Sequence, residues 1–427
     1  MDNYNIFSFD NGFKYLTLQP AKCDVFDYCV IYILIRCGSI FDPKELSGIS
    51  HYLEHMPFKG SKNYEAVKDI AFKLDTMGAE TNAFTDKDIT GFHIKIPSNY
   101  VIEGFKILAD IVLNPLVRNK DTELERNVIL EEYRDTLDDS SCILDELLHK
   151  HLFKGHNLSK SEIGIETTIN NIKASDIRKH HEKYYKLSEM GLVLVGNFPQ
   201  EIHKHIKRLF SPVSKLYVPL VQTNFVFNCN VPNVIYKHKK DLNQTCISVV
   251  FSTVNFNESD KDILEFIGTY LGEGMSSRLF IELREKNSLV YTVEAEQCSY
   301  NTGGYFSIET QLKSKNIEKT ISIILKELDL LKKGKISNED IKKCKNLIEG
   351  DIKMDKSDLC NVAEYYNYQF LYGDKIETFS DYINQVKSIN KEQIKTIASK
   401  YFNNAFVFIV GKTTETTINN IKKLLKK

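Results

Sequence analysis

Two passages of the chain follow the same course, and this repetition limits the possible folds more than any other feature of the sequence. The first begins near Ile169 and ends in the apolar run Leu192–Gly196, and the second begins near Ile383 and ends in Val407–Gly411. Each passage has the spacing of a helix followed by a short apolar run, which is typical of a buried strand. We therefore predict an internal duplication of two similar domains.

Other segments extend this repetition. The strand pattern at 28–36 has a counterpart at 246–251, and the helix pattern from Asp121 has one at 337–340. Asn11-Gly12 between two strand patterns is a strong hairpin signal. Because strands come first and helices return over them, we expect an α+β fold, with a mainly antiparallel sheet covered by helices in each domain.

The domain boundary is predicted from a change in composition. Prolines mark the weakly periodic stretch 213–232, which is typical of a linker. The expected N-terminal domain is 1–212 and the expected C-terminal domain is 233–427.

Composition excludes several classes of function. The 427 residues include 56 basic and 57 acidic side chains, so the near-neutral chain has no charge footprint for nucleic acid or a membrane surface. Nine cysteines without a C-x-x-C pair argue against a disulfide framework. The first residues lack the pattern of a signal peptide. We expect a bacterial cytoplasmic protein, with a processed mitochondrial or other organellar protein as the alternative.

The segment His51-x-x-Glu54-His55 is the strongest chemical signal. On a helix these three side chains project from one side, while Ile49 and Leu53 lie on the other, and Pro57 is expected to end the helix. This spacing is the inverted zinc-peptidase signature, with two histidine ligands and a glutamate as general base. The alternative is a surface helix with solvated side chains.

A catalytic zinc ion needs a third protein ligand, and one later helix offers three carboxylates. Glu132 is the preferred candidate because apolar residues flank it, and a carboxylate buried there needs a cation. Glu125 forms a possible capping box with Thr122 at the expected helix start. Glu131 lies on the face expected to be solvated. All 11 histidines lie at or before His238, so the second domain cannot carry a copy of the two-histidine site.

Longer motifs resemble a known family. They are Gly48-x-x-His51-x-x-Glu54-His55-Met56-x-Phe58-Lys59-Gly60, Asn82-Ala83-Phe84-Thr85, Asn114-Pro115, Glu125-Arg126-x-Val128-Ile129-x-x-Glu132, Gly272–Phe280, and Arg284 with Tyr291. Together they resemble the pitrilysin/insulysin family of inverted-zincin metallopeptidases. The resemblance covers essentially the whole chain and is closest to the half-length type, such as the mitochondrial processing peptidase β-subunit and its bacterial homologues.

The resemblance implies a zinc endopeptidase that cleaves extended peptides or presequence-like segments. It implies one Zn²⁺ per chain on His51, His55 and Glu132, with Glu54 as general base and Glu125 in a supporting acidic role. It also implies that Asn82, Ala83, Phe84 and Thr85 form an edge strand to which the peptide adds as a further β-strand. Arg284 and Tyr291 are implied to contact the substrate.

Members of this size form half of a closed chamber, so the resemblance implies a homodimer. The near-neutral charge argues against nucleic acid or a membrane as partner. The alternatives are a non-catalytic scaffold or core subunit of a larger complex, and the catalytic half of a heterodimer. The remaining histidines of the central region lie on polar sequence and are expected at the surface. They are His149, His151, His156, His180 and His181.

Overall fold

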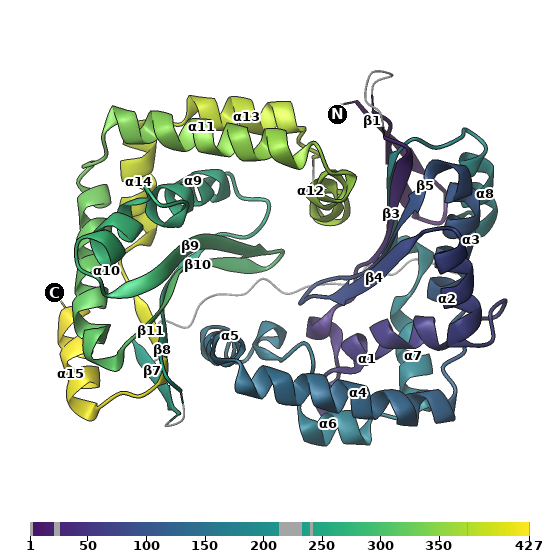
Figure 1. Ribbon diagram of the computed structural model, residues 1–427, viewed down its shortest axis with the longest axis horizontal. Helices are drawn as coiled ribbons and strands as arrows, with labels where there is room; N and C mark the ends of the chain where they lie inside the picture. The colour runs from purple at the N-terminus through teal and green to yellow at the C-terminus, as the bar shows by residue number, and fades with distance from the viewer. Residues whose placement is uncertain (1–2, 21–25, 213–232, 240–241, 374, 427) are drawn as a thin grey trace. The chain divides into compact units, whose positions relative to one another are not determined.

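The computed structural model describes residues 3–20, 26–212, 233–239, 242–373 and 375–426 (Figure 1). These residues form two compact units, each with its own mixed, mostly antiparallel sheet and its own helices. The first unit contains 3–134, 160–212 and 353–379, and the second contains 135–159, 233–352 and 380–426. The predicted α+β class is therefore confirmed.

The first unit is built on a six-stranded sheet of order β1-β2-β6-β3-β5-β4. Its strands are β1 (Tyr4–Ser8), β2 (Lys14–Leu18), β3 (Tyr28–Ile35), β4 (Glu80–Thr85), β5 (Thr90–Pro97) and β6 (Met190–Gly196). β2 and β6 are parallel, and every other neighbouring pair is antiparallel. The hairpin of β1 and β2 turns at Gly12, whose φ of 89° favours glycine. This confirms the hairpin predicted from Asn11-Gly12.

Helices cover both faces of this sheet. The helices of the whole unit are α1 (Ile49–His55), α2 (Val67–Thr76), α3 (Val101–Leu113), α4 (Asn119–Asp138), α6 (Glu166–Asn171), α7 (Ala174–Tyr184), α8 (Ile202–Phe210) and α12 (Leu359–Tyr372). In Figure 1, α3 lies on one face of the sheet and α12 lies on the other. The apolar run of β3 is buried on both sides for this reason: Ile31 and Ile33 join the main core, whereas Tyr32 donates a hydrogen bond to Glu364 of α12.

The second unit repeats this plan with a five-stranded sheet of order β7-β11-β8-β10-β9. Its strands are β7 (Val234–His238), β8 (Thr245–Thr253), β9 (Val290–Tyr300), β10 (Gly303–Leu312) and β11 (Phe406–Gly411). Its helices are α5 (Ser140–Leu152), α9 (Asp260–Gly272), α10 (Ile317–Lys332), α11 (Asn338–Asp355), α13 (Phe379–Ser388), α14 (Lys391–Tyr401) and α15 (Glu415–Leu424). The order and directions of its strands match those of β2-β6-β3-β5-β4, as a duplication requires.

Short helical turns complete both units. They are η1 (Ser39–Phe41), η2 (Lys44–Leu46), η3 (Met56–Lys59), η4 (Ser98–Tyr100), η5 (Asn157–Ser159), η6 (Leu187–Glu189), the π-helical turn η7 (Phe280–Glu285) and η8 (Ser314–Asn316). Pro57 lies in the first turn of η3, where its missing N–H costs nothing, so the chain tightens into a 3₁₀ turn after α1. The chain turns away only at Gly60, whose φ is 142°.

The compact units do not coincide with two continuous stretches of sequence. α5 packs on β8 and β11 of the second unit, whereas α12 packs on β3 and β6 of the first unit. The predicted linker 213–232 lies outside the described residues, so that boundary stays a prediction. No described helix has both the length and the apolar character needed to cross a membrane.

Candidate metal centre

Helix α1 buries one face and presents the other. Tyr52, Leu53 and Met56 are fully buried in the core of the first unit, and Ile49 is 1% exposed. His51, Glu54 and His55 lie on the remaining side, as the helical spacing predicts. Gly48 precedes the helix with a φ of 94°, and a Cβ there would lie 2.4 Å from the carbonyl oxygen of Ile163. The chain therefore enters α1 through a position that only glycine fits.

The structure brings His51, His55 and Glu132 together. One ligand atom from each of the three lies within 4.8 Å of the other two. Glu132 Oε2 is 3.7 Å from His51 Nε2 and 3.6 Å from His55 Nε2. Two zinc bonds of about 2.1 Å at a tetrahedral angle place their ligand atoms roughly 3.4 Å apart. The spacing and the donor set therefore fit a zinc ion with three protein ligands.

Glu132 reaches this position because α4 is fixed at both sides. The hydroxyl of Tyr52 in α1 donates a hydrogen bond to the carbonyl oxygen of Thr122 in α4. Arg126 in α4 donates to the carbonyl oxygens of Ile169 and Ile172, at the end of α6. These buried polar contacts hold the helix against α1, so the carboxylate of Glu132 meets the two imidazoles.

The neighbouring Glu131 belongs to the solvated face, as the sequence predicts. Its side chain is 70% exposed and pairs with Arg134 on the same helix. Surface pairs of this kind contribute little to stability. Glu131 is therefore no part of the cluster.

Glu125 supports His55 from behind. Its side chain is 5% exposed, and its Oε1 lies 2.8 Å from Nδ1 of His55, while Lys59 pairs with its other oxygen. A carboxylate on Nδ1 holds the proton there and leaves the Nε2 lone pair for a metal. The capping-box interpretation of Glu125 is wrong, because α4 begins at Asn119 and the hydroxyl of Thr122 donates to the carbonyl oxygen of Arg118. Glu125 therefore supports the ring of His55 and does not cap the start of α4.

The environments of the two imidazoles shift their pKa values in opposite directions. Burial, together with the nearby His55, lowers the pKa of His51 to about 3, so its ring is neutral and able to bind a metal. Burial also lowers the pKa of His55, but its bond to Glu125 and the surrounding carboxylates outweigh this effect and raise the pKa above its ordinary value. Nδ1 of His51 is buried and has no hydrogen-bond partner among the described residues. His51 thus lacks the supporting carboxylate that orients His55.

Glu54 lies on the same face of α1 but is not one of the three clustered ligands. Burial raises the pKa of its carboxyl group, and a hydrogen bond with Thr85 opposes this shift. A carboxyl group with a raised pKa is suited to accept and return a proton near neutral pH. The sequence did not reveal the contact with Thr85, because the two residues are far apart in the chain and only the packing of α1 on β4 joins them.

The predicted peptide-binding residues Asn82, Ala83, Phe84 and Thr85 all lie in β4. β4 ends the six-stranded sheet and pairs only with β5 among the described strands, so its other backbone edge is open. The ring of Phe84 covers Gly91 of β5, where a Cβ would lie 2.3 Å from the ring. The side chain of Asn82 is exposed and accepts a hydrogen bond from the backbone N–H of Ala83.

Arg284 and Tyr291 belong to the second unit, at the end of η7 and the start of β9. The guanidinium carbon of Arg284 lies 4.8 Å from the ring centroid of Tyr291, within the range of a cation–π contact. Tyr291 is 71% exposed. The structure therefore brings these two predicted substrate-contact residues together.

Two of the histidines expected at the surface are buried, so that prediction is wrong for them. His149 is 3% exposed and its Nε2 lies 2.7 Å from the hydroxyl of Tyr300, while His180 is 5% exposed and its Nε2 lies 3.0 Å from Oγ of Ser50. Each ring finds a polar partner that the local sequence does not reveal. The helical spacing of His180 with the buried Ile177 and Tyr184 is the signal that would have placed it inside.

Family models and curated relatives match most of the chain. Residues 24–165 match the family model described as insulinase (peptidase family M16), and residues 171–348 match the model of the peptidase M16 inactive domain. An uncharacterised zinc protease of Bacillus subtilis is 26% identical over 376 residues, covering 87% of this chain and 90% of that protein. A probable mitochondrial-processing peptidase β-subunit of Arabidopsis thaliana is 23% identical over 382 residues, covering 86% of this chain and 71% of that protein.

Solved structures show the same fold. A protease from Helicobacter pylori superposes with a TM-score of 0.85 at 22% identity, covering 96% of this chain and all of that one. A peptidase M16 inactive domain from Pseudomonas fluorescens superposes with a TM-score of 0.84 at 18% identity, covering 96% of this chain and 99% of that one.

Proposed function

This chain belongs to the insulinase/pitrilysin family of peptidases, M16, in its half-length form, and from that membership and its metal centre we propose that it is a zinc-dependent endopeptidase. The observation that carries the proposal is the cluster of His51, His55 and Glu132, with Glu54 beside it on α1 and Glu125 behind His55. One Zn²⁺ per chain would be held by the three clustered residues.

Peptide hydrolysis at this site would use the zinc ion and a few side chains around it. A bound zinc ion lowers the pKa of a water ligand and polarises a carbonyl group. Glu54 accepts the proton of the attacking water and returns it to the leaving amine, so the same carboxylate serves both halves of the hydrolysis. Glu125 keeps the proton of His55 on Nδ1, and the buried, neutral His51 presents a free lone pair.

The substrate that this site suits is an extended peptide. The open edge of β4 offers backbone donors and acceptors to a further strand, with side-chain pockets supplying selectivity. α1 packs against β4, so a peptide added there runs beside the helix that carries Glu54. Arg284 and Tyr291 are assigned substrate contacts from the family motif, and a homodimer is the assembly we propose for this half-length chain.

The decisive experiment compares the wild-type chain with Glu54→Gln. Both proteins should contain about one zinc ion per chain, because Glu54 is not a ligand. Wild-type protein should cleave members of a mixed peptide library, read by mass spectrometry, and the variant should be slower by about 10²–10⁴-fold, the range for loss of a general base. A chelator should abolish cleavage by the wild-type protein, and added zinc should restore it.

A zinc-free wild-type chain without peptidase activity would overturn the proposal in favour of a scaffold or core subunit. Retained turnover in Glu54→Gln would remove Glu54 from the role of base. Light scattering on the same samples reports whether the chain is a homodimer, and activity that appears only with a second, different chain would indicate half of a heterodimer.

A further inference from the structure

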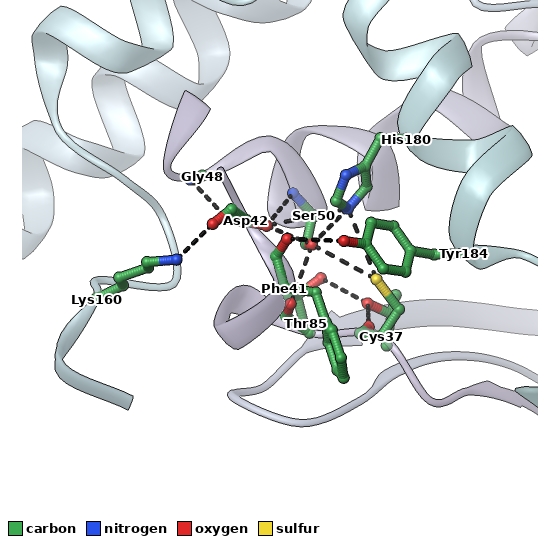
Figure 2. Close-up of polar contacts among 11 residues, drawn as sticks. Cys37, Phe41, Asp42, Gly48, Ser50, Thr85, Lys160, His180 and Tyr184 are labelled. Carbon is green, nitrogen blue, oxygen red and sulfur yellow. Dashed lines mark hydrogen bonds and ion pairs between the residues drawn. The ribbon is translucent and has the colours of Figure 1, made fainter. Parts of the chain in front are cut away.

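A buried polar cluster lies at the start of α1, the helix that carries His51 and His55 (Figure 2). It contains Asp42 from the turn after η1, Ser50 from α1 and His180 from α7, and all three side chains are almost completely buried. Ser50 Oγ lies 2.6 Å from Asp42 Oδ1 and 3.0 Å from His180 Nε2. Cys37 completes the cluster, with its sulfur 3.6 Å from the same ring nitrogen.

Asp42 also holds the backbone of α1. Its Oδ2 accepts the N–H of Gly48 at 2.7 Å, and its Oδ1 accepts the N–H of Ser50 at 3.2 Å. These are two of the N–H groups that a helix start leaves without partners, and no side chain of the N-cap residue Gly48 can satisfy them. A carboxylate from outside the helix therefore performs the capping.

The direction of the hydrogen bonds follows from the partners of Ser50. Two oxygen acceptors lie beside its single hydroxyl proton, Oδ1 of Asp42 at 2.6 Å and the carbonyl oxygen of Gly38 at 3.2 Å, so the hydroxyl proton is directed to them and away from His180. Nε2 of His180 must then carry a proton and donate it to the oxygen of Ser50. Ser50 is thus saturated and buried, and the cluster is no nucleophilic serine triad, in which the hydroxyl would donate to the histidine.

The two histidines of the metal centre differ in the hydrogen-bond partners that orient their rings. Glu125 orients the ring of His55 directly, whereas Nδ1 of His51 has no hydrogen-bond partner among the described residues. The direction of His51 therefore depends on the backbone of α1 at the adjacent Ser50. α1 has only seven residues, and so short a helix has little stability of its own and takes its position from tertiary contacts.

We propose that Asp42, Ser50 and His180 are positioning residues of the metal centre, which fix the first turn of α1 and through it the imidazole of His51. The inference rests on the proposed zinc peptidase. It concerns residues that do not touch the metal or the substrate. Removal of the cluster should weaken zinc binding while the fold is retained.

The test uses the full chain with Ser50→Ala. The dissociation constant for zinc, measured by competition with a chromophoric chelator, should rise about 10-fold, as for loss of an outer-shell partner. The visible absorption of the cobalt-substituted protein should change, because the ligand geometry changes. The value of kcat should fall while KM stays near its wild-type value, since β4 is untouched.

Ser61→Ala is the matched control. Ser61 is also fully buried in the first unit and donates a 2.6 Å hydrogen bond to a buried aspartate, Asp110. Among the described residues its hydrogen bonds go to Asp110 and Tyr64, neither of which belongs to α1. Its loss should lower thermal stability as much as Ser50→Ala does, with an unchanged zinc dissociation constant and cobalt spectrum. The pair thereby separates positioning of the metal centre from stability alone.

A second pair of variants tests the same cluster if Ser50→Ala does not fold. His180→Gln keeps an N–H donor for Ser50 and should bind zinc nearly as the wild type does, whereas His180→Leu should lose affinity. The inference is overturned if Ser50→Ala or His180→Leu folds and binds zinc within twofold of the wild type with an unchanged cobalt spectrum. A wild-type chain that binds no zinc would overturn the proposed function as well, so the two failures are distinguishable.

Discussion

The two units share one scaffold but differ at the place where the first unit clusters two histidines and a glutamate. Strands β2-β6-β3-β5-β4 and β7-β11-β8-β10-β9 have the same order and directions, and in each unit a helix follows the central strand. That helix is α1 in the first unit and α9 in the second, and α9 contains no histidine. The fold alone therefore does not supply a zinc site.

The partner helices show the same difference. Glu125 and Cys344 stand at the same distance from Asn119 and Asn338, the first residues of α4 and α11, and both are buried. Glu125 keeps its charge because His55 and Lys59 compensate it. α9 offers no imidazole to α11, and burial raises the pKa of Cys344 to about 11, so the buried side chain at this position is an uncharged thiol. The two units therefore share a framework, and a few side chains decide whether that framework carries a candidate metal centre or only a packed core.

The largest expected effect comes from the ligand on α4. Glu132→Gln removes the carboxylate that lies between the two imidazoles, so its zinc affinity should fall by at least about 100-fold, more than for an outer-shell residue. Glu131→Gln is the neighbouring control and should bind zinc as the wild type does, because Glu131 is exposed and pairs with Arg134. Metal analysis after dialysis, followed by chelator competition, measures both. Full zinc occupancy in Glu132→Gln would remove this residue from the ligand set.

A smaller effect is expected behind His55. Glu125→Gln keeps an oxygen for Nδ1 of His55 but removes the charge, so zinc affinity should fall about 10-fold. The comparison variant is Cys344→Ser in the second unit, which should change thermal stability alone. Chelator competition and thermal unfolding measure the two outcomes. Equal zinc affinity in both variants would mean that Glu125 is merely the packing counterpart of Cys344.

Local patterns predicted the elements that carry the site. The apolar flank expected around Glu132 is not buried, since its side chain is 41% exposed and Val128 is 45% exposed, so the packing of α4 on α1 places this carboxylate. By contrast, the periodicity around His51 predicted α1 and the side of the helix from which His51 and His55 project. Such signals are available because each depends on residues a few positions apart. The β1–β2 hairpin was predictable for the same reason.

What the sequence missed depends on contacts between distant segments. Glu125 pairs with His55 and not with the start of its own helix. The buried ring of His180 is satisfied by a hydrogen bond with Ser50, which is 130 residues away in the chain. The placement of α12 is a further case. Amphipathic spacing predicts that this helix packs on a sheet but does not specify which sheet, and it packs on β3 and β6 of the first unit.

One buried group in each sheet should also make the stability of the protein depend on pH, and the two dependences should have opposite directions. This is the smallest of the expected effects. Tyr32 pairs with His93 on β3 and β5, and Ser248 pairs with Glu309 on β8 and β10. Burial lowers the pKa of His93 below its ordinary value of 6.5, so the neutral ring is preferred and its contribution to stability is lost as pH falls below that value. Burial raises the pKa of Glu309 from 4.5 to about 7, so its contribution is present below pH 4.5 and is lost as pH rises toward 7.

Glu309→Gln should therefore stabilise the protein by about 1 kcal/mol at pH 8 and leave it unchanged at pH 4, whereas His93→Gln should stabilise it only in acid. Thermal unfolding followed by circular dichroism at pH 4 to 8 measures both variants, and equal shifts at every pH would show that neither group's titration is linked to folding.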